Sequence, residues 1–121
     1  IGLATLRRDG FGYLSPKEDD NTAHFVTAAV AVGKGARLRL NVEGVSPAAP
    51  LTVELLDGRD RPVPGYAGTA AARVVANGTG LDVVWPGARA GGLPAGQPLA
   101  VKVTFPVGSM ARVFAVYVID G

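Results

Sequence analysis

Residues 36–43 read ARLRLNVE, and residues 98–105 read PLAVKVTF. In the first stretch the apolar side chains of Leu38, Leu40 and Val42 share one face. The opposite face, expected in solvent, holds Arg37, Arg39, Asn41 and Glu43. The second stretch repeats the alternation, with its apolar face ending on Phe105. A period of two with one apolar face is typical of an antiparallel strand that covers a core on one side. These two stretches predict an all-β protein.

Other segments repeat the strand signal along the chain. Alternating apolar residues also run through 51–55 and 81–85. Residues 22–32 and 110–119 are β-rich and more continuously apolar, which is typical of central strands or of strands covered on two sides. Residues 69–75 combine three alanines with two valines. We expect an edge strand or an irregular segment there, because so few residues do not form a stable helix.

Turn signals separate these segments. They are Asp9-Gly10, Gly33-Lys34-Gly35, Asp57-Gly58, Pro64-Gly65 and Asn77-Gly78. Short strands are expected on either side of the first turn, at 2–7 and 11–15. Strands at this spacing predict a sandwich or a barrel. We therefore expect residues 1–121 to form a single all-β domain, a two-sheet antiparallel β-sandwich of about eight strands with jelly-roll topology.

The composition excludes several classes of protein. With 121 residues, of which 48% are hydrophobic and 18% charged, the chain is neither disordered nor long enough for two domains. It has no cysteine and one histidine, which excludes disulfide scaffolds, thiolate metal sites and multi-histidine clusters. The net charge is +2 and the basic residues are dispersed, so nucleic acid is not an expected partner. No apolar run approaches the length of about 18 residues that a membrane helix needs, so no membrane partner is expected.

Few residues offer catalytic chemistry. His24 is the only side chain that can act as the base for a serine nucleophile, and its apolar surroundings favour a partly buried strand histidine instead. Hydrolysis of a glycoside needs two facing carboxylates. The strand carboxylates, which alternate outward as ordinary solvated charges do, are Glu43, Glu54 and Asp82. We therefore expect no enzyme activity from this chain by itself.

One acidic run can hold a cation. Residues 18–21 read EDDN, and their oxygens suit a hard cation such as calcium, with Asp19 and Asp20 as the candidate ligands. The run lacks the spacing of an EF-hand loop, so a solvated loop is the favoured alternative. No other cofactor is expected.

The eight aromatic residues divide into core and surface candidates. Trp85 shares the face of Leu81 and Val83, and Phe105 follows the inward alternation of its strand, so both are predicted to lie in the core. Tyr13 and Tyr66 are the better candidates for exposed rings, because Tyr66 follows a turn. Exposed rings can stack on the apolar faces of sugars, and these two tyrosines are therefore the candidate carbohydrate-binding residues.

The opening residues 1–11, IGLATLRRDGF, resemble the start of a known β-sandwich module. This is the C-terminal module attached to five-bladed β-propeller proteins of the glycoside hydrolase family 32-like kind, the glycosyl hydrolases. Nearly the whole chain takes part in the resemblance. The further matching stretches are 22–30 leading to Thr27, GARLRLNV at 35–42, LTVELLD at 51–57, RPVPGY at 61–66, VVWPG at 83–87, and VKVTF at 101–105 through Phe114.

The resemblance implies a supporting role. In such proteins the catalytic carboxylates belong to the propeller, so no catalytic residue is carried over to this chain. The expected function is a non-catalytic accessory domain that packs on a β-propeller glycosidase domain and touches its glycan. The alternatives are an autonomous carbohydrate-binding module and a structural or assembly subunit. Residues 70–80 depart from the family pattern, because they are rich in alanine where the family is polar and acidic. The compartment cannot be read from the residues, although glycan degradation would fit an extracellular location.

Overall fold

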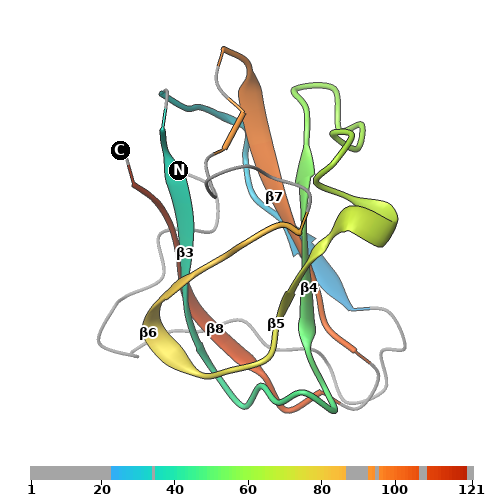
Figure 1. The fold of residues 1–121 in the computed structure, drawn as a ribbon, viewed down its shortest axis with the longest axis vertical. Coiled ribbons are helices and arrows are strands. Elements are labelled where there is room, and N and C mark those ends of the chain that lie inside the picture. The colour runs from blue at the N-terminus through green and yellow to red at the C-terminus, as the bar shows by residue number, and fades with distance from the viewer. Residues whose placement is uncertain (1–22, 34, 87–92, 95, 107–108, 120–121) are drawn as a thin grey trace.

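The computed structural model describes residues 23–33, 35–86, 93–94, 96–106 and 109–119. It consists of two antiparallel sheets (Figure 1). The first sheet contains β1 (His24–Val26), β2 (Val30–Ala31), β4 (Leu51–Leu56), β5 (Ala72–Val74) and β7 (Pro98–Thr104). The second contains β3 (Arg37–Glu43), β6 (Gly78–Asp82) and β8 (Arg112–Ile119). The predicted all-β, two-sheet architecture is confirmed.

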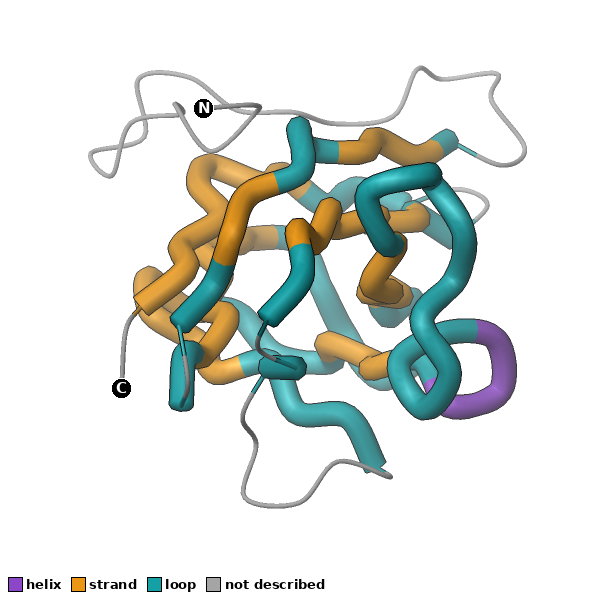
Figure 2. Tube along the Cα trace, turned by 90° about the horizontal axis from the view of Figure 1, so that it is seen from above, coloured by secondary structure: helices purple, strands orange, loops and turns teal. Residues whose placement is uncertain are grey.

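The order of the strands follows from the pairings. In the first sheet the order is β1-β7-β4-β5, and β2 also pairs with β7; in the second it is β6-β3-β8. A short 3₁₀ helix, Gly68–Ala70, precedes β5 and projects at one side of the molecule (Figure 2). Residues 69–75 thus contain a short edge strand, as the sequence indicates. No helix in the described ranges has the length and the hydropathy that a membrane span requires.

The core lies between the two sheets, and the alternating side chains build it. Leu38, Leu40 and Val42 of β3 have no exposed surface. They belong to the same buried cluster as the inward residues of β4 and β7, which are Leu51, Val53, Leu55, Leu99, Val101 and Val103. Burying these side chains removes apolar surface from water, at about 25 cal/mol per Å². The inward faces predicted for the two decisive stretches are therefore confirmed.

Most connections pass from one sheet to the other. Among the described strands, β4 and β5 are the one pair that is both consecutive in the chain and hydrogen-bonded to each other. The chain changes sheet at five steps, which are β2 to β3, β3 to β4, β5 to β6, β6 to β7 and β7 to β8. The pairings β1–β7 and β3–β8 interleave along the chain. The jelly-roll topology is not confirmed by these pairings.

Three strand predictions need correction. The described part of the predicted segment 22–32, which begins at residue 23, forms two short strands on the outer side of β7 rather than a central strand, and His24 in β1 is exposed rather than partly buried. For residues 110–119 the second of the two expected alternatives holds: β8 is an edge among the described strands, but its residues 113–116 are all buried, as in a strand that is covered on two sides. The pair Asn77-Gly78 is not simply a turn, because Gly78 begins β6 and the strand ends at Asp82, before Trp85. The short strands expected at 2–7 and 11–15 lie outside the described residues.

Candidate functional site

The pairing register of β3 shifts near Asn41 on both of its neighbours, β6 and β8. Between Leu40 and Val42, the partner positions on β6 change from Leu81 to Gly78, so β6 carries one extra residue. Between Asn41 and Val42, the partners on β8 change from Ala115 to Val113, so β8 also carries one extra residue. Asn41 therefore lies between two β-bulges, one on each side. Bulges redirect side chains and are frequent beside functional sites.

The bulge on β8 explains why two residues of this strand that are three positions apart both face the core. Val113 and Val116 both belong to the core cluster, although three positions separate them. Strict alternation would place residues three apart on opposite faces. The extra residue, Phe114, shifts the alternation by one and returns Val116 to the core side, where it lies opposite Leu40. The residues on either side of the bulge can thus face the same core.

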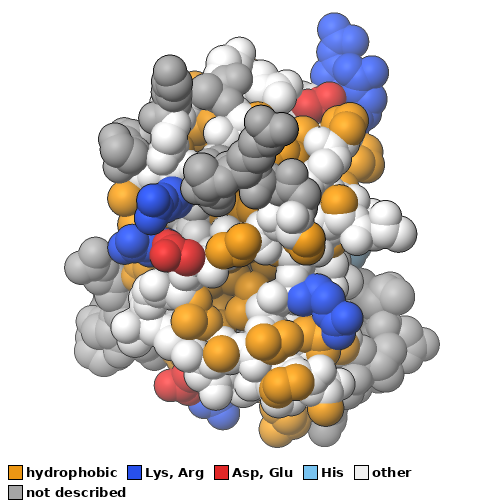
Figure 3. Space-filling model, viewed as in Figure 1, with side chains coloured by type: hydrophobic (Ala, Val, Ile, Leu, Met, Phe, Trp, Pro, Cys, Tyr) orange, Lys and Arg blue, Asp and Glu red, His pale blue; other side chains and the backbone are white. Residues whose placement is uncertain are grey.

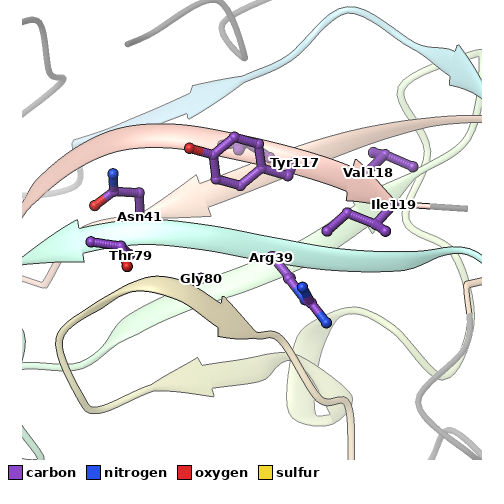
Figure 4. A pocket seen from close by; sticks show the side chains of 8 residues that line it. Arg39, Asn41, Thr79, Gly80, Tyr117, Val118 and Ile119 are labelled. Carbon is purple, nitrogen blue, oxygen red and sulfur yellow. The ribbon is translucent and has the colours of Figure 1, made fainter. Parts of the chain in front are cut away.

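A groove of about 590 Å³ lies on the outer face of β6, β3 and β8, at the level of these bulges. Its described lining comes from all three strands (Figure 4). The lining residues are Arg39, Asn41, Thr79, Gly80, Val116, Tyr117, Val118 and Ile119. This volume falls within the range of about 300–1,000 Å³ that small-molecule sites occupy. We take this groove as the candidate functional site and refer to it as the outer groove.

The charge in the outer groove belongs to Arg39, on the central strand. Its Nε atom donates a hydrogen bond to Oδ1 of Asp82 at 2.8 Å, and Asp82 lies directly opposite on β6. The two side chains are 38% and 48% exposed, so water screens this ion pair. The pair contributes little to stability, but it holds the guanidinium in place at the rim of the groove. Tyr117 lies directly opposite Arg39 on the other side, on β8.

Asn41 and Gly80 define the floor and the open side of the groove. Asn41 is only 4% exposed, which corrects the expectation that it faces solvent with its polar neighbours on β3. Its amide lies on the outer face but is buried beside the two bulges. A Cβ atom added at Gly80 would meet no atom within 4 Å, so this glycine leaves space on the β6 side. A larger side chain at Gly80 would occupy the groove.

The two predicted core aromatics lie in the core. Trp85 has no exposed surface, and Phe105 is 4% exposed. The Nε1 atom of Trp85 donates a hydrogen bond to the carbonyl oxygen of Val53 at 3.1 Å. A buried indole N–H needs such a partner, because leaving it unpaired would cost free energy. Phe105 packs beside Phe25, with 6.2 Å between the ring centroids.

Of the predicted ligand-binding residues, Tyr66 is the one within the described ranges, and it does not line the outer groove. Tyr66 is half-buried rather than exposed, and its ring packs edge-on against Trp85 at a centroid distance of 5.5 Å. Tyr13, Asp19 and Asp20 lie outside the described residues. Within the part of the chain that the structure describes, no group of three or more histidine, cysteine, aspartate or glutamate residues is placed to hold a metal ion.

Four of the five described carboxylates, those of Glu43, Glu54, Asp57 and Asp82, pair with cations or backbone N–H groups. Asp82 pairs with Arg39, Glu43 with Arg112 at 3.9 Å, and Asp57 with Arg61 at 3.3 Å. Oε2 of Glu54 accepts a hydrogen bond from the backbone N–H of Gly68 at 2.8 Å.

Sequence reasoning missed Tyr117 as a groove residue. The aromatic side chains singled out for ligand contact were Tyr13 and Tyr66, whereas Tyr117 lies in a continuously apolar segment that indicates a covered strand. The alternation of β3 places Arg39 on the outer face, and the residue that pairs with Arg39 on the neighbouring strand shares that face. That pairing is not visible in the sequence of either strand alone.

Comparison of the chain with protein-family models, with curated proteins and with solved structures finds no match. The resemblance to the propeller-associated module therefore rests on the stretches quoted from the sequence.

Proposed function

We propose that this chain is a non-catalytic accessory module of a carbohydrate-active protein, and that its outer groove contacts a saccharide. The observation that carries the proposal is the groove itself, which lies beside two bulges and is lined by a guanidinium, a hydroxyl, an amide and an aromatic ring. Sugars present hydroxyl groups at their edges and apolar faces on their rings, so polar groups beside a ring suit them. The family resemblance supports the same class of ligand.

The location of the site can be tested by backbone amide NMR. Neutral and acidic oligosaccharides are titrated into the chain, and we expect fast-exchange shifts confined to β6, β3 and β8, with no release of reducing sugar. Gly80→Leu should abolish the shifts without loss of fold, because it fills the groove from a position with open space. Arg73→Leu, an exposed residue on edge strand β5, is the matched control and should bind normally. Shifts elsewhere, or none with any sugar, would refute the proposal.

A second observation favours contact with a neighbouring domain. The end of the sandwich formed by residues 44–50, 75–77 and 109–111, here called the apolar end, exposes 79% of Met110 and 42% of Val75. Hydrogen bonds hold these loops in place, since the backbone N–H of Val45 donates to Oδ1 of Asn77 at 2.8 Å. Hydrophobic side chains also gather on the lower part of the face seen in Figure 3. An exposed apolar surface on well-held loops suits packing against a partner such as a propeller domain.

This second function needs the full-length protein for its test. We expect Met110→Lys to lower the unfolding temperature of the full-length protein more than that of this chain alone. Val84→Lys, at another exposed hydrophobic residue away from the apolar end, is the control and should change neither unfolding temperature. An equal effect of Met110→Lys on the chain alone would assign this residue to the stability of the sandwich instead.

A further inference from the structure

Arg39 has hydrogen-bond donors that no other described residue of the chain engages. A guanidinium carries five N–H donors in a planar fork. Its Nε–H bonds to Asp82, and within the described ranges neither Nη atom has a hydrogen-bond partner. The side chain is 38% exposed and lines the groove. The Nη end of the fork is therefore available to a ligand, while Asp82 holds the other side of the guanidinium still.

The charges around the outer groove favour an anion. No acidic residue contributes to its described lining. Asp82 is engaged with Arg39, and Glu43 lies toward the end of β3, where it pairs with Arg112. Arg37, two residues from Arg39 on the same face of β3, is exposed and adds a further positive charge. The outer face of this sheet thus has three arginines against two carboxylates, and the cation nearest the groove is Arg39.

The remaining lining suits a ring that carries hydroxyl groups. On the β8 side, Tyr117 and Ile119 present an aromatic ring and an aliphatic side chain (Figure 4). On the β6 side, the exposed hydroxyl of Thr79 faces the same groove. An apolar flank opposite a polar flank, with a guanidinium at the rim, does not match a simple inorganic anion or a hydrocarbon acid. It matches a sugar ring that bears a carboxylate.

We propose that the outer groove selects carboxylate-bearing saccharides of the uronic acid class, with Arg39 as the group that binds the carboxylate. This inference rests on the proposed function and names its ligand. The Nη atoms of Arg39 donate to the two carboxylate oxygens in the bidentate geometry that arginine favours. The sugar ring lies against Tyr117, and its hydroxyls reach Thr79. Lysine at position 39 would keep the charge but lose the fork.

The test compares acids with their esters, because esterification removes the charge and leaves the sugar ring unchanged. Trigalacturonate, a mannuronate trimer and the methyl esters of both are titrated into the intact chain by calorimetry and by amide NMR. We expect each preferred acid to bind at least tenfold more tightly than its ester. Arg39→Gln should weaken binding of the acid about 10- to 100-fold, as loss of a charge-assisted hydrogen-bond pair does, and should leave the ester unaffected. Arg37→Gln, which removes a more distant charge from the same face of β3 but no lining residue of the groove, is the matched control and should reduce the preference far less than Arg39→Gln does.

The outcomes separate this inference from the proposed function. Equal affinity for acid and ester in the unsubstituted chain would overturn the selection of acids and leave saccharide binding intact. A preference that survives Arg39→Gln would overturn the role of Arg39. Absence of groove shifts with every acid and ester would overturn the selection of uronic acids, and absence of shifts with the neutral oligosaccharides as well would overturn the proposed function. Should Arg39→Gln fail to fold, Arg39→Lys tests the role of Arg39, because lysine keeps the charge but loses the fork and should therefore bind the acid more weakly. The comparison of acid with ester in the unsubstituted chain then tests the selection of acids.

Discussion

Trp85 shows how one side chain joins the two sheets. It follows β6 of the second sheet, is fully buried, and donates its indole N–H to the carbonyl oxygen of Val53 on β4 of the first. The rings of Tyr66 and Trp85 pack against each other in a T-shaped arrangement. The tryptophan therefore contributes both packing and a hydrogen bond between layers.

Two substitutions separate these contributions. Trp85→Ala should lower the free energy of unfolding by about 3–5 kcal/mol, because it leaves a large cavity. Trp85→Phe should cost less, since it keeps an aromatic ring but leaves the carbonyl oxygen of Val53 without the indole donor. Val84→Ala, at the exposed neighbouring residue, should change stability by no more than about 0.5 kcal/mol. Urea unfolding of the variants measures these differences. An Ala variant as stable as the unsubstituted chain would contradict the core role.

Gly44 and Gly65 differ in surroundings although both have positive φ, +77° and +85°. A Cβ atom at Gly44 would collide with the carbonyl oxygen of Met110 and lie 2.9 Å from its carbon, whereas one at Gly65 would meet nothing within 4 Å. Gly65→Ala should therefore cost about 1–2 kcal/mol for the left-handed backbone alone. Gly44→Ala should cost about 1–3 kcal/mol more, because the backbone must also move apart. Equal losses in thermal unfolding would show that the close approach to Met110 yields easily.

Asp57 gives the stability a dependence on pH. Hydrogen bonds from the backbone N–H groups of Arg61 and Arg59 to its carboxylate, helped by the Arg61 charge, lower the pKa of Asp57 below its ordinary value of 3.8. Since the folded pKa is the lower one, the contribution to stability is present above the unfolded value. It is lost as the pH falls through the folded pKa.

The sign of this effect is testable. Asp57→Asn should lower the unfolding temperature at neutral pH, and the difference from the unsubstituted chain should shrink as the pH is lowered below 3.8. Arg59→Ala is the control, because Arg59 reaches Asp57 through its backbone N–H, which the substitution retains. A difference that grows on acidification would show that the folded chain does not favour the ionised form.

At the scale of the elements, the strands differ in how many neighbours hold them. β3, β4 and β7 each pair on both sides, whereas β5 pairs only with β4 and has three residues. Backbone amides exchange slowly where opening requires loss of many contacts. We expect the amides of β3, β4 and β7 to exchange most slowly, and those of β2 and β5 fastest, in an NMR exchange experiment. Slow exchange throughout β5 would indicate a further partner on that edge.

At the scale of the whole molecule, the repeated changes of sheet make the two layers inseparable. β1 pairs with β7 across 80 residues, as in the register His24↔Thr104, and β3 pairs with β8 across a similar span. Such pairings require closure of long loops before contacts form, which slows folding. We expect one cooperative unfolding transition, identical by Trp85 fluorescence and far-ultraviolet circular dichroism, and refolding in milliseconds to seconds. Separate transitions for the two signals would contradict a single cooperative unit.

Local patterns determined the strands and their inward faces. The inward faces of residues 36–43 and 98–104 follow from the period of two in a strand. Trp85 and Phe105 lie just beyond the ends of β6 and β7, and the removal of their apolar surface from water accounts for their burial. The Pro64-Gly65 turn follows as well, because proline fixes φ at the first central position and glycine accepts the positive φ of the second. These effects act within one segment, so the sequence of that segment reveals them.

The tertiary structure alone decided the site. Asn41 is buried and Tyr117 lines the outer groove because β6 and β8 each add one residue beside β3, and that mismatch exists only once the strands pair. Tyr66 follows a turn, yet it is half-buried because Trp85, 19 residues further along the chain, lies beneath its ring. The edge positions of β1 and β5 likewise depend on which strands take the centre of the sheet. Each of these features is set by packing between residues that lie far apart in the chain, and no local alternation encodes which distant strand becomes a neighbour.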